Sequence, residues 1–258
     1  MPTTFPSGPA PPGSGLRYSI LMQEDRESLI VALDVADGGK SRALVQELGE
    51  AVSFYKVGNE LFTAEGPSVV RDLVANGKKV FLDLKFHDIP NTVAGAVRTA
   101  ATLGVSLLTV HAGGGSKMLR AAAEAAAQSH SKPIVLAVTV LTSLDRNDLE
   151  EVGGCGSVEG QVLRLAGLAL DAGCGGIVAS AQESASLRRT LGNGFTLVTP
   201  GIRPAGGVAG DQARVVTPED AIRAGANYLV VGRPITASDN PREATRAITE
   251  QIELARSR

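Results

Sequence analysis

Cysteine is scarce in this chain of 258 residues, which contains only Cys155 and Cys174. The two cysteines form no C-x-x-C pair or other metal-binding spacing, and two lone cysteines are typical of a reducing cytosol. His87 and His111 are not at ligand spacing with carboxylates on one helix either. We therefore expect a cytoplasmic protein with no metal site.

Long hydrophobic runs and an excess of one charge are also missing. No apolar run reaches about 18 residues, so no membrane-spanning helix is expected. The formal net charge is −2, which predicts no strong attraction to nucleic acid or to an anionic membrane. The first residues, MPTTFPSGPAPPGSG, lack the basic start and apolar core of a signal peptide. Their composition predicts a disordered tail and lead-in over residues 1–27, with the folded domain over 28–258.

From Leu29 onward the sequence alternates short β-branched runs with amphipathic or Ala-rich helical patterns. This alternation predicts parallel βαβ units, and eight units in roughly 230 residues predict a single (β/α)₈ barrel of the α/β class. A doubly wound open sheet is the alternative, although no G-x-G-x-x-G follows the first predicted strand. The predicted strands are 29–33, 52–57, 80–84, 106–110, 134–138, 176–179, 196–199 and 228–231. The predicted helices are 40–48, 67–76, 92–103, 116–128, 158–171, 182–191, 218–224 and 241–255.

The third predicted strand carries the motif D-x-K-x-x-D, formed by Asp83, Lys85 and Asp88. Asp83 and Lys85 are two residues apart on a strand, so their side chains point to the same face, and Asp88 follows beyond the strand end. Burying such charges is costly unless they pair or do chemistry. Neighbouring carboxylates favour the protonated lysine, which makes Lys85 a candidate proton donor. A surface salt bridge is the simpler alternative.

Other polar residues follow the predicted strands at their carboxyl ends, where barrel enzymes place their active sites. Asp34 ends the first strand and Lys56 the second; a helix N-cap and an exposed lysine are their simpler alternatives. Further along, the fourth strand ends at His111, the fifth leads to Thr142 and Ser143, and the seventh leads to Arg203. We therefore expect these groups to converge on one face.

The segment YLVVGR at 228–233 predicts an anion site after the last strand. Gly232 allows close backbone approach, and Arg233 offers a forked, permanently charged donor to a phosphate. The long glycine-rich loop after the seventh strand predicts a lid. For His111, which precedes three glycines, we favour a local structural role. Whether His87 takes part in the chemistry stays open.

Several blocks together resemble the orotidine 5′-phosphate decarboxylase family. They are LIVALD at 29–34, FYKVG at 54–58, LDLKFHDIPNT at 82–92, LTS at 141–143, TPGIR at 199–203, DQARVVTP at 211–218 and VVGR at 230–233. D-x-K-x-x-D alone also occurs in sugar-phosphate decarboxylases and synthases on the same barrel. The FHDIPNT extension, LTS and TPGIR…DQ narrow the resemblance to the orotidylate enzyme.

The resemblance implies decarboxylation of orotidine 5′-phosphate to uridine 5′-phosphate, the last step of de novo UMP synthesis, without cofactor or metal. It implies that Lys85 donates a proton to C6, flanked by Asp83 and Asp88. It also implies a homodimer in which Asp88 and Thr92 reach the partner's site. The remaining implied contacts are Asp34 and Lys56 to the ribose, Thr142 to the pyrimidine, Pro200 near the reacting edge, and Gln212, Gly232 and Arg233 to the phosphate, with Arg203 close by.

Two alternatives to this reading stay open. A metal-dependent sugar-phosphate enzyme of the same superfamily would lose activity to a chelator. A catalytically inactive phosphate-binding protein is the other alternative, although every charged position of the matched blocks is intact.

Overall fold

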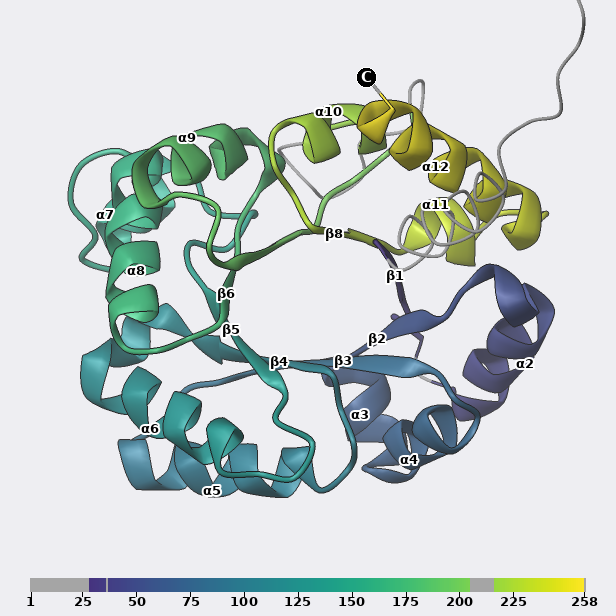
Figure 1. The fold of residues 1–258 in the computed structure, drawn as a ribbon, viewed down its shortest axis with the longest axis horizontal. Coiled ribbons are helices and arrows are strands. Elements are labelled where there is room, and N and C mark those ends of the chain that lie inside the picture. The colour runs from purple at the N-terminus through teal and green to yellow at the C-terminus, as the bar shows by residue number, and fades with distance from the viewer. Residues whose placement is uncertain (1–27, 36, 205–215, 258) are drawn as a thin grey trace, which may run out of the picture.

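The computed structural model describes residues 28–35, 37–204 and 216–257, and the described strands form one closed parallel barrel in chain order (Figure 1). The eight strands are β1 (Leu29–Ala32), β2 (Phe54–Gly58), β3 (Lys79–Phe86), β4 (Leu107–His111), β5 (Ile134–Val138), β6 (Gly176–Val178), β7 (Thr196–Thr199) and β8 (Tyr228–Val231). β1 pairs with both β2 and β8, which closes the sheet. The predicted (β/α)₈ barrel is therefore confirmed, and the open-sheet alternative is wrong. The predicted tail, 1–27, lies outside the described residues.

Helices surround the barrel in Figure 1 and alternate with the strands along the chain. Those expected from periodicity are α2 (Gly38–Leu48), α4 (Ser68–Ala75), α5 (Pro90–Ala101), α6 (Gly115–Ala127), α8 (Val158–Asp171), α9 (Ala181–Leu191), α10 (Pro218–Arg223) and α12 (Pro241–Arg256). The sequence interpretation missed α3 (Asn59–Glu65), α7 (Arg146–Glu151), α11 (Arg233–Thr236) and the 3₁₀ turns η1 (Gly49–Ala51) and η2 (Ala112–Gly114). These elements are too short to show a helical period.

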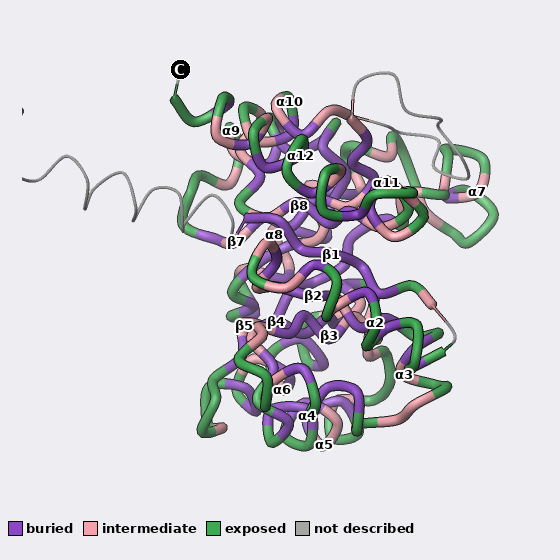
Figure 2. Tube along the Cα trace, turned by 90° about the vertical axis from the view of Figure 1, so that its right-hand side faces the viewer, coloured by how far each residue is buried: buried purple, intermediate pink, exposed green. Residues whose placement is uncertain are grey.

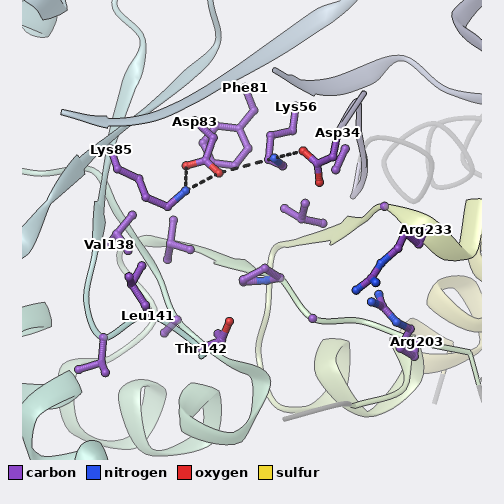
Figure 3. A pocket seen from close by; sticks show the side chains of 18 residues that line it. Asp34, Lys56, Phe81, Asp83, Lys85, Val138, Leu141, Thr142, Arg203 and Arg233 are labelled. Carbon is purple, nitrogen blue, oxygen red and sulfur yellow. Dashed lines mark hydrogen bonds and ion pairs between the residues drawn. The ribbon is translucent and has the colours of Figure 1, made fainter. Parts of the chain in front are cut away.

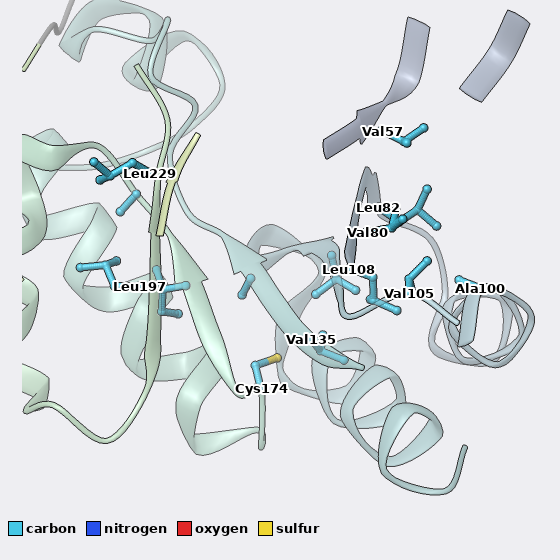
Figure 4. Packing of buried hydrophobic residues seen from close by; sticks show 14 of the residues in the cluster. Val57, Val80, Leu82, Ala100, Val105, Leu108, Val135, Cys174, Leu197 and Leu229 are labelled. Carbon is cyan, nitrogen blue, oxygen red and sulfur yellow. The ribbon is translucent and has the colours of Figure 1, made fainter. Parts of the chain in front are cut away.

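Side chains alternate between two cores along each strand. The inner core fills the barrel with Ile30, Ala32, Phe54, Phe81, Leu107, Leu136, Val198 and Val230. A second core lies between strands and helices and includes Val57, Leu82, Leu108 and Leu229 (Figure 4). Cys174 belongs to this outer core, and burial raises the pKa of its thiol to about 12. Figure 2 shows the same division, with buried strands inside and exposed positions on the outer helices.

The alternation is interrupted where β3 meets β4. Leu82 pairs with Leu108 but Phe86 pairs with Val110, so four steps along β3 match only two along β4. Lys85 lies in this bulge with φ 50°, a left-handed conformation that is uncommon for residues other than glycine. The bulge therefore re-aims the chain immediately after Asp83.

At the opposite, amino-terminal end of the barrel, two cations bind carbonyl groups of the loops. Arg188 of α9 donates to the carbonyls of Gly225 and Phe195, bonds Asn227 and lies over the Phe195 ring. Lys78 donates to the carbonyls of Gly49 and Val52. These contacts tie together loops that precede the strands. Across the described ranges, no helix is long and apolar enough to cross a membrane.

Candidate active site

Four side chains of alternating charge form a continuous chain at the carboxyl ends of β1, β2 and β3 (Figure 3). Lys56 Nζ lies 2.7 Å from Asp34 Oδ1 and 3.8 Å from Asp83 Oδ2. Lys85 Nζ lies 2.9 Å from Asp83 Oδ2 and 3.0 Å from Asp83 Oδ1. Each inner member of the chain therefore has an opposite charge on both sides.

The inner charges are removed from bulk water. The side chains of Lys56 and Asp83 are only 12% and 13% exposed, and that of Lys85 is 33% exposed. Charges this far removed from water are stable only when opposite charges lie beside them. The alternation of carboxylates and ammonium groups supplies these opposite charges. The simpler interpretation of Lys56 as an exposed strand-end lysine is therefore wrong, whereas Asp83 and Lys85 do form a salt bridge, one that is partly buried.

Asp34 follows β1 but is not a helix cap. The N-cap of α2 is Asp37, whose carboxylate accepts a hydrogen bond from the Lys40 N–H. Asp34 is instead engaged with Lys56. Gly58 makes room for that pair, because a Cβ there would lie 2.9 Å from Lys56 Nζ and 3.4 Å from Asp34 Oδ1.

Thr109 of β4 is a site residue that the sequence interpretation missed. Its hydroxyl lies 2.9 Å from Asp83 Oδ1 and 2.9 Å from the backbone nitrogen of Lys85. The signal that could have found it is its place in LLTVH, where a polar side chain shares the inward face with Leu107 and His111.

The charge chain lines a cavity of about 480 Å³ at this end of the barrel. An apolar floor and wall complete it, formed by Ala32, Phe81, Val138, Val140, Leu141, Val178, Ala179, Pro200 and Val230. Thr142 contributes a hydroxyl from the loop after β5, where Figure 3 shows it beside Leu141. Such a mixture of an apolar wall and a few convergent polar groups is typical of a small-molecule site.

Two arginines lie at the other side of the cavity from Lys85 (Figure 3). The guanidinium groups of Arg203 and Arg233 point toward each other there. Arg203 is 7% exposed, and its burial, followed by repulsion from Arg233, lowers the pKa of its guanidinium. An anion between the two groups would remove this cost, because guanidinium binds phosphate or carboxylate oxygens in a forked geometry.

Gly232, between β8 and Arg233, also lines the cavity. Among the described residues, a Cβ there would meet only Ala32 and Asp34, at 3.6 Å each, so packing against them does not require glycine at this position. The glycine instead keeps backbone accessible beside the arginines. Gln212, which the resemblance assigns to the phosphate, lies outside the described residues.

Asp88 and Thr92, both described, are not among the residues that line this cavity. Both are exposed, and Asp88 accepts a hydrogen bond from the Ile89 N–H at 2.6 Å. The structure therefore places Asp83 against Lys85 and leaves Asp88 on the surface beyond β3.

The two histidines near the motif stack on each other, with ring centroids 5.2 Å apart. His111 Nδ1 accepts a hydrogen bond from the Gly113 N–H, as expected for a local structural role. Burial, and then repulsion from His87 and Lys85, lowers the pKa of His111. Within the part of the chain that the structure describes, no group of three or more His, Cys, Asp or Glu is arranged to hold a metal.

The barrel and its site define a class of protein: a (β/α)₈ barrel whose strand ends line a cavity with a carboxylate-held ammonium group on one side and two arginines on the other. The chain matches the family model described as orotidine 5′-phosphate decarboxylase / HUMPS over residues 27–248. This match covers most of the sequence, so the chain belongs to that family.

Known relatives agree with this assignment. Orotidine 5′-phosphate decarboxylase of Moorella thermoacetica is 53% identical over 90% of this chain and 94% of its own length. The Nitrosococcus oceani protein of the same name is 53% identical over 88% of this chain and 98% of its own. Among solved structures, orotidine 5′-phosphate decarboxylase from Lactobacillus acidophilus superposes with a TM-score of 0.78. It is 39% identical and covers 88% of this chain and 99% of its own.

Proposed function

We propose that this protein converts orotidine 5′-phosphate to uridine 5′-phosphate and CO₂, the last step of de novo UMP synthesis. One observation carries the proposal: an ammonium held by Asp83 and a pair of arginines line opposite sides of one cavity. The family match and the names of the relatives support the same reaction.

The reaction requires a positioned proton donor more than a covalent partner. Loss of CO₂ from C6 leaves an electron pair in the plane of the pyrimidine ring, where the π system cannot delocalise it. The Lys85 ammonium neutralises this charge as it forms and delivers a proton to C6, which stabilises the transition state selectively. Asp83 keeps the ammonium in place and lies near the substrate carboxylate.

The other cavity residues form three groups, which bind the phosphate, the ribose and the pyrimidine of the substrate. Arg233, Gly232 and Gln212 hold the phosphate, with Arg203 beside them, and the burial of Arg203 next to a second cation, Arg233, supports this anion site. Asp34 and Lys56, at the end of the charge chain away from Lys85, bind the ribose hydroxyls. Thr142 contacts the pyrimidine, and Pro200 packs near its reacting edge. Phosphate binding energy, gained far from the bond that breaks, thus orders the site for chemistry.

We further propose a homodimer in which Asp88 and Thr92 complete the partner's site. Their exposure beside Ile89, an apolar side chain that is 67% exposed, supports an interface at this loop. A test combines two inactive variants, Lys85→Ala and Asp88→Ala, by tagged co-expression. In a mixed dimer one site collects both lesions and the other has none, so random mixing restores roughly a quarter of wild-type activity. Isolated mixed dimers as inactive as their parents would contradict the shared site.

The direct test of the reaction is the loss of orotidine 5′-phosphate absorbance with purified protein, with and without EDTA. We expect turnover that EDTA leaves unchanged. A metal-dependent sugar-phosphate reaction is the second candidate, because D-x-K-x-x-D is common to both groups. Absence of orotidylate turnover, together with a sugar-phosphate activity that EDTA abolishes, would favour that candidate.

A further inference from the structure

Thr109 lies in the middle of β4 and is fully buried. It alternates with Leu107, a member of the inner core, so its side chain faces the barrel interior. Thr109 is described but is not among the residues lining the cavity. Any effect of Thr109 on a bound ligand must therefore pass through the residues that it touches.

Its hydroxyl touches both partners of the central ion pair. The Lys85 backbone N–H can only donate, so the Thr109 oxygen accepts that bond at 2.9 Å. The ionised Asp83 carboxylate can only accept, so the same hydroxyl donates to Asp83 Oδ1, also at 2.9 Å. The two bonds together define the orientation of the hydroxyl and hold Asp83 and the Lys85 backbone in one geometry.

The bulge between β3 and β4 explains why the Lys85 N–H bonds a side chain and not a backbone carbonyl. In regular pairing Leu84, not Phe86, would lie opposite Val110, but β3 carries two extra residues here. Lys85 consequently has φ 50° and bonds a side chain of β4 in place of a ladder carbonyl. Without the Thr109 hydroxyl, the Lys85 N–H loses this hydrogen-bond partner. The energetic cost of the left-handed backbone at Lys85 is then no longer offset by that bond.

We propose that Thr109 is a positioning residue that sets where the Lys85 ammonium and the Asp83 carboxylate stand in the site (Figure 3 shows this pair). The inference rests on the proposed decarboxylation, in which Lys85 delivers the proton. A bulge without this hydroxyl would relax toward regular pairing and displace Lys85 from its place beside the cavity.

The test compares three purified variants by steady-state kinetics. Thr109→Val keeps the volume but removes both hydrogen bonds, and we expect kcat to fall about 100-fold, as for a displacement near 1 Å. KM changes less than about threefold, because the contacts with the substrate remain. Thr109→Ser retains the hydroxyl and restores kcat. Thr139→Val is the matched control: Thr139 is equally buried, but its hydroxyl bonds the Val178 carbonyl outside the charge chain.

A Thr109→Val enzyme with kcat within about threefold of wild type would overturn the inference, as would an equal loss in Thr139→Val. A crystal structure of Thr109→Val separates this inference from the proposed function. Should the wild-type protein fail to decarboxylate the substrate, a displaced Lys85 in that structure still supports the positioning role, and an unmoved Lys85 overturns it. If Thr109→Val does not fold, Thr109→Cys, with only a weak donor and acceptor, takes its place in the same measurements.

Discussion

The two ends of the barrel use the same kinds of cationic side chain in opposite ways. At the amino-terminal end, Arg188 and Lys78 are bound by backbone carbonyls of the loops that enter the strands. At the carboxyl end, Lys56 and Lys85 are bound by carboxylates, and Arg203, which donates to the Ile202 carbonyl, is buried next to Arg233 on one side of the cavity. Arg188 and Lys78 do not line the cavity and stabilise the fold, whereas the cations that line the cavity are placed to bind an anion or transfer a proton.

Lys85→Ala should give the largest effect at the carboxyl end. Turnover of orotidine 5′-phosphate should fall at least about 100-fold, because a positioned proton donor contributes this much or more. The variant should remain folded and unfold cooperatively on heating, because Asp83 keeps its ion pair with Lys56 and its hydrogen bond from Thr109. Turnover within about tenfold of wild type, equivalent to about 1.4 kcal/mol, would remove Lys85 from the mechanism.

Arg233→Ala should weaken binding of the phosphorylated substrate by about 1.5–3 kcal/mol, the typical contribution of a hydrogen bond to a charged group. The very slow turnover of orotidine, which lacks the phosphate, should barely change. Arg246→Ala serves as a control, since Arg246 is an exposed arginine paired with Glu243 and Glu250 on α12. Equal losses for orotidine and its phosphate would show that Arg233 does not bind the phosphate.

Arg188→Met should reverse the pattern at the amino-terminal end. Loss of its bonds to Gly225 and Phe195 leaves carbonyls without partners, so the free energy of unfolding should fall by about 1–3 kcal/mol. The kcat should stay near wild type, since these contacts lie at the other end of the barrel. Urea unfolding and steady-state kinetics measure both quantities. Arg223→Met, which removes a partly exposed ion pair to Glu219 on one helix, is the control and should cost less than about 0.5 kcal/mol. A large loss of kcat in Arg188→Met would contradict the claim that cations at the amino-terminal end stabilise the fold without affecting the reaction.

His111 should give the smallest effect, and one that depends on pH. Its pKa in the folded protein lies below the ordinary value of 6.5, mainly because it is buried. Below pH 6.5 the unfolded chain binds a proton that the folded protein resists, so this part of the stability is present above pH 6.5 and is lost as pH falls toward the folded pKa.

Urea unfolding at pH 7.5 and pH 5.5 measures this contribution. His111→Asn keeps an acceptor for the Gly113 N–H, and its stability should fall less between these two pH values than that of the wild type. His130→Asn is the control, because His130 is exposed. Identical pH dependence in His111→Asn and wild type would show that His111 does not contribute.

Much of the barrel could be predicted from local pattern. The sequence pattern predicts three strands with the same bounds as the structure, because runs rich in β-branched residues between turn residues favour strands. These strands are Ile134–Val138, Thr196–Thr199 and Tyr228–Val231. The charged strand ends could be recognised for the same reason, since burying Asp83 or Lys56 without partners is costly. Short helices such as α3 and α7 were missed because a few residues show no period.

By itself the sequence determined the order of strands and helices, the charged motif and the family resemblance, because these depend on neighbouring residues and their spacing. Only the tertiary structure decided that the sheet closes, that Asp34 pairs with Lys56 and does not cap a helix, and that Arg203 faces Arg233. It also decided that Lys85 lies in a bulge bonded to Thr109, 24 residues away along the chain. The physical reason is that such contacts join strands distant in sequence, and their register is set by packing of the whole barrel.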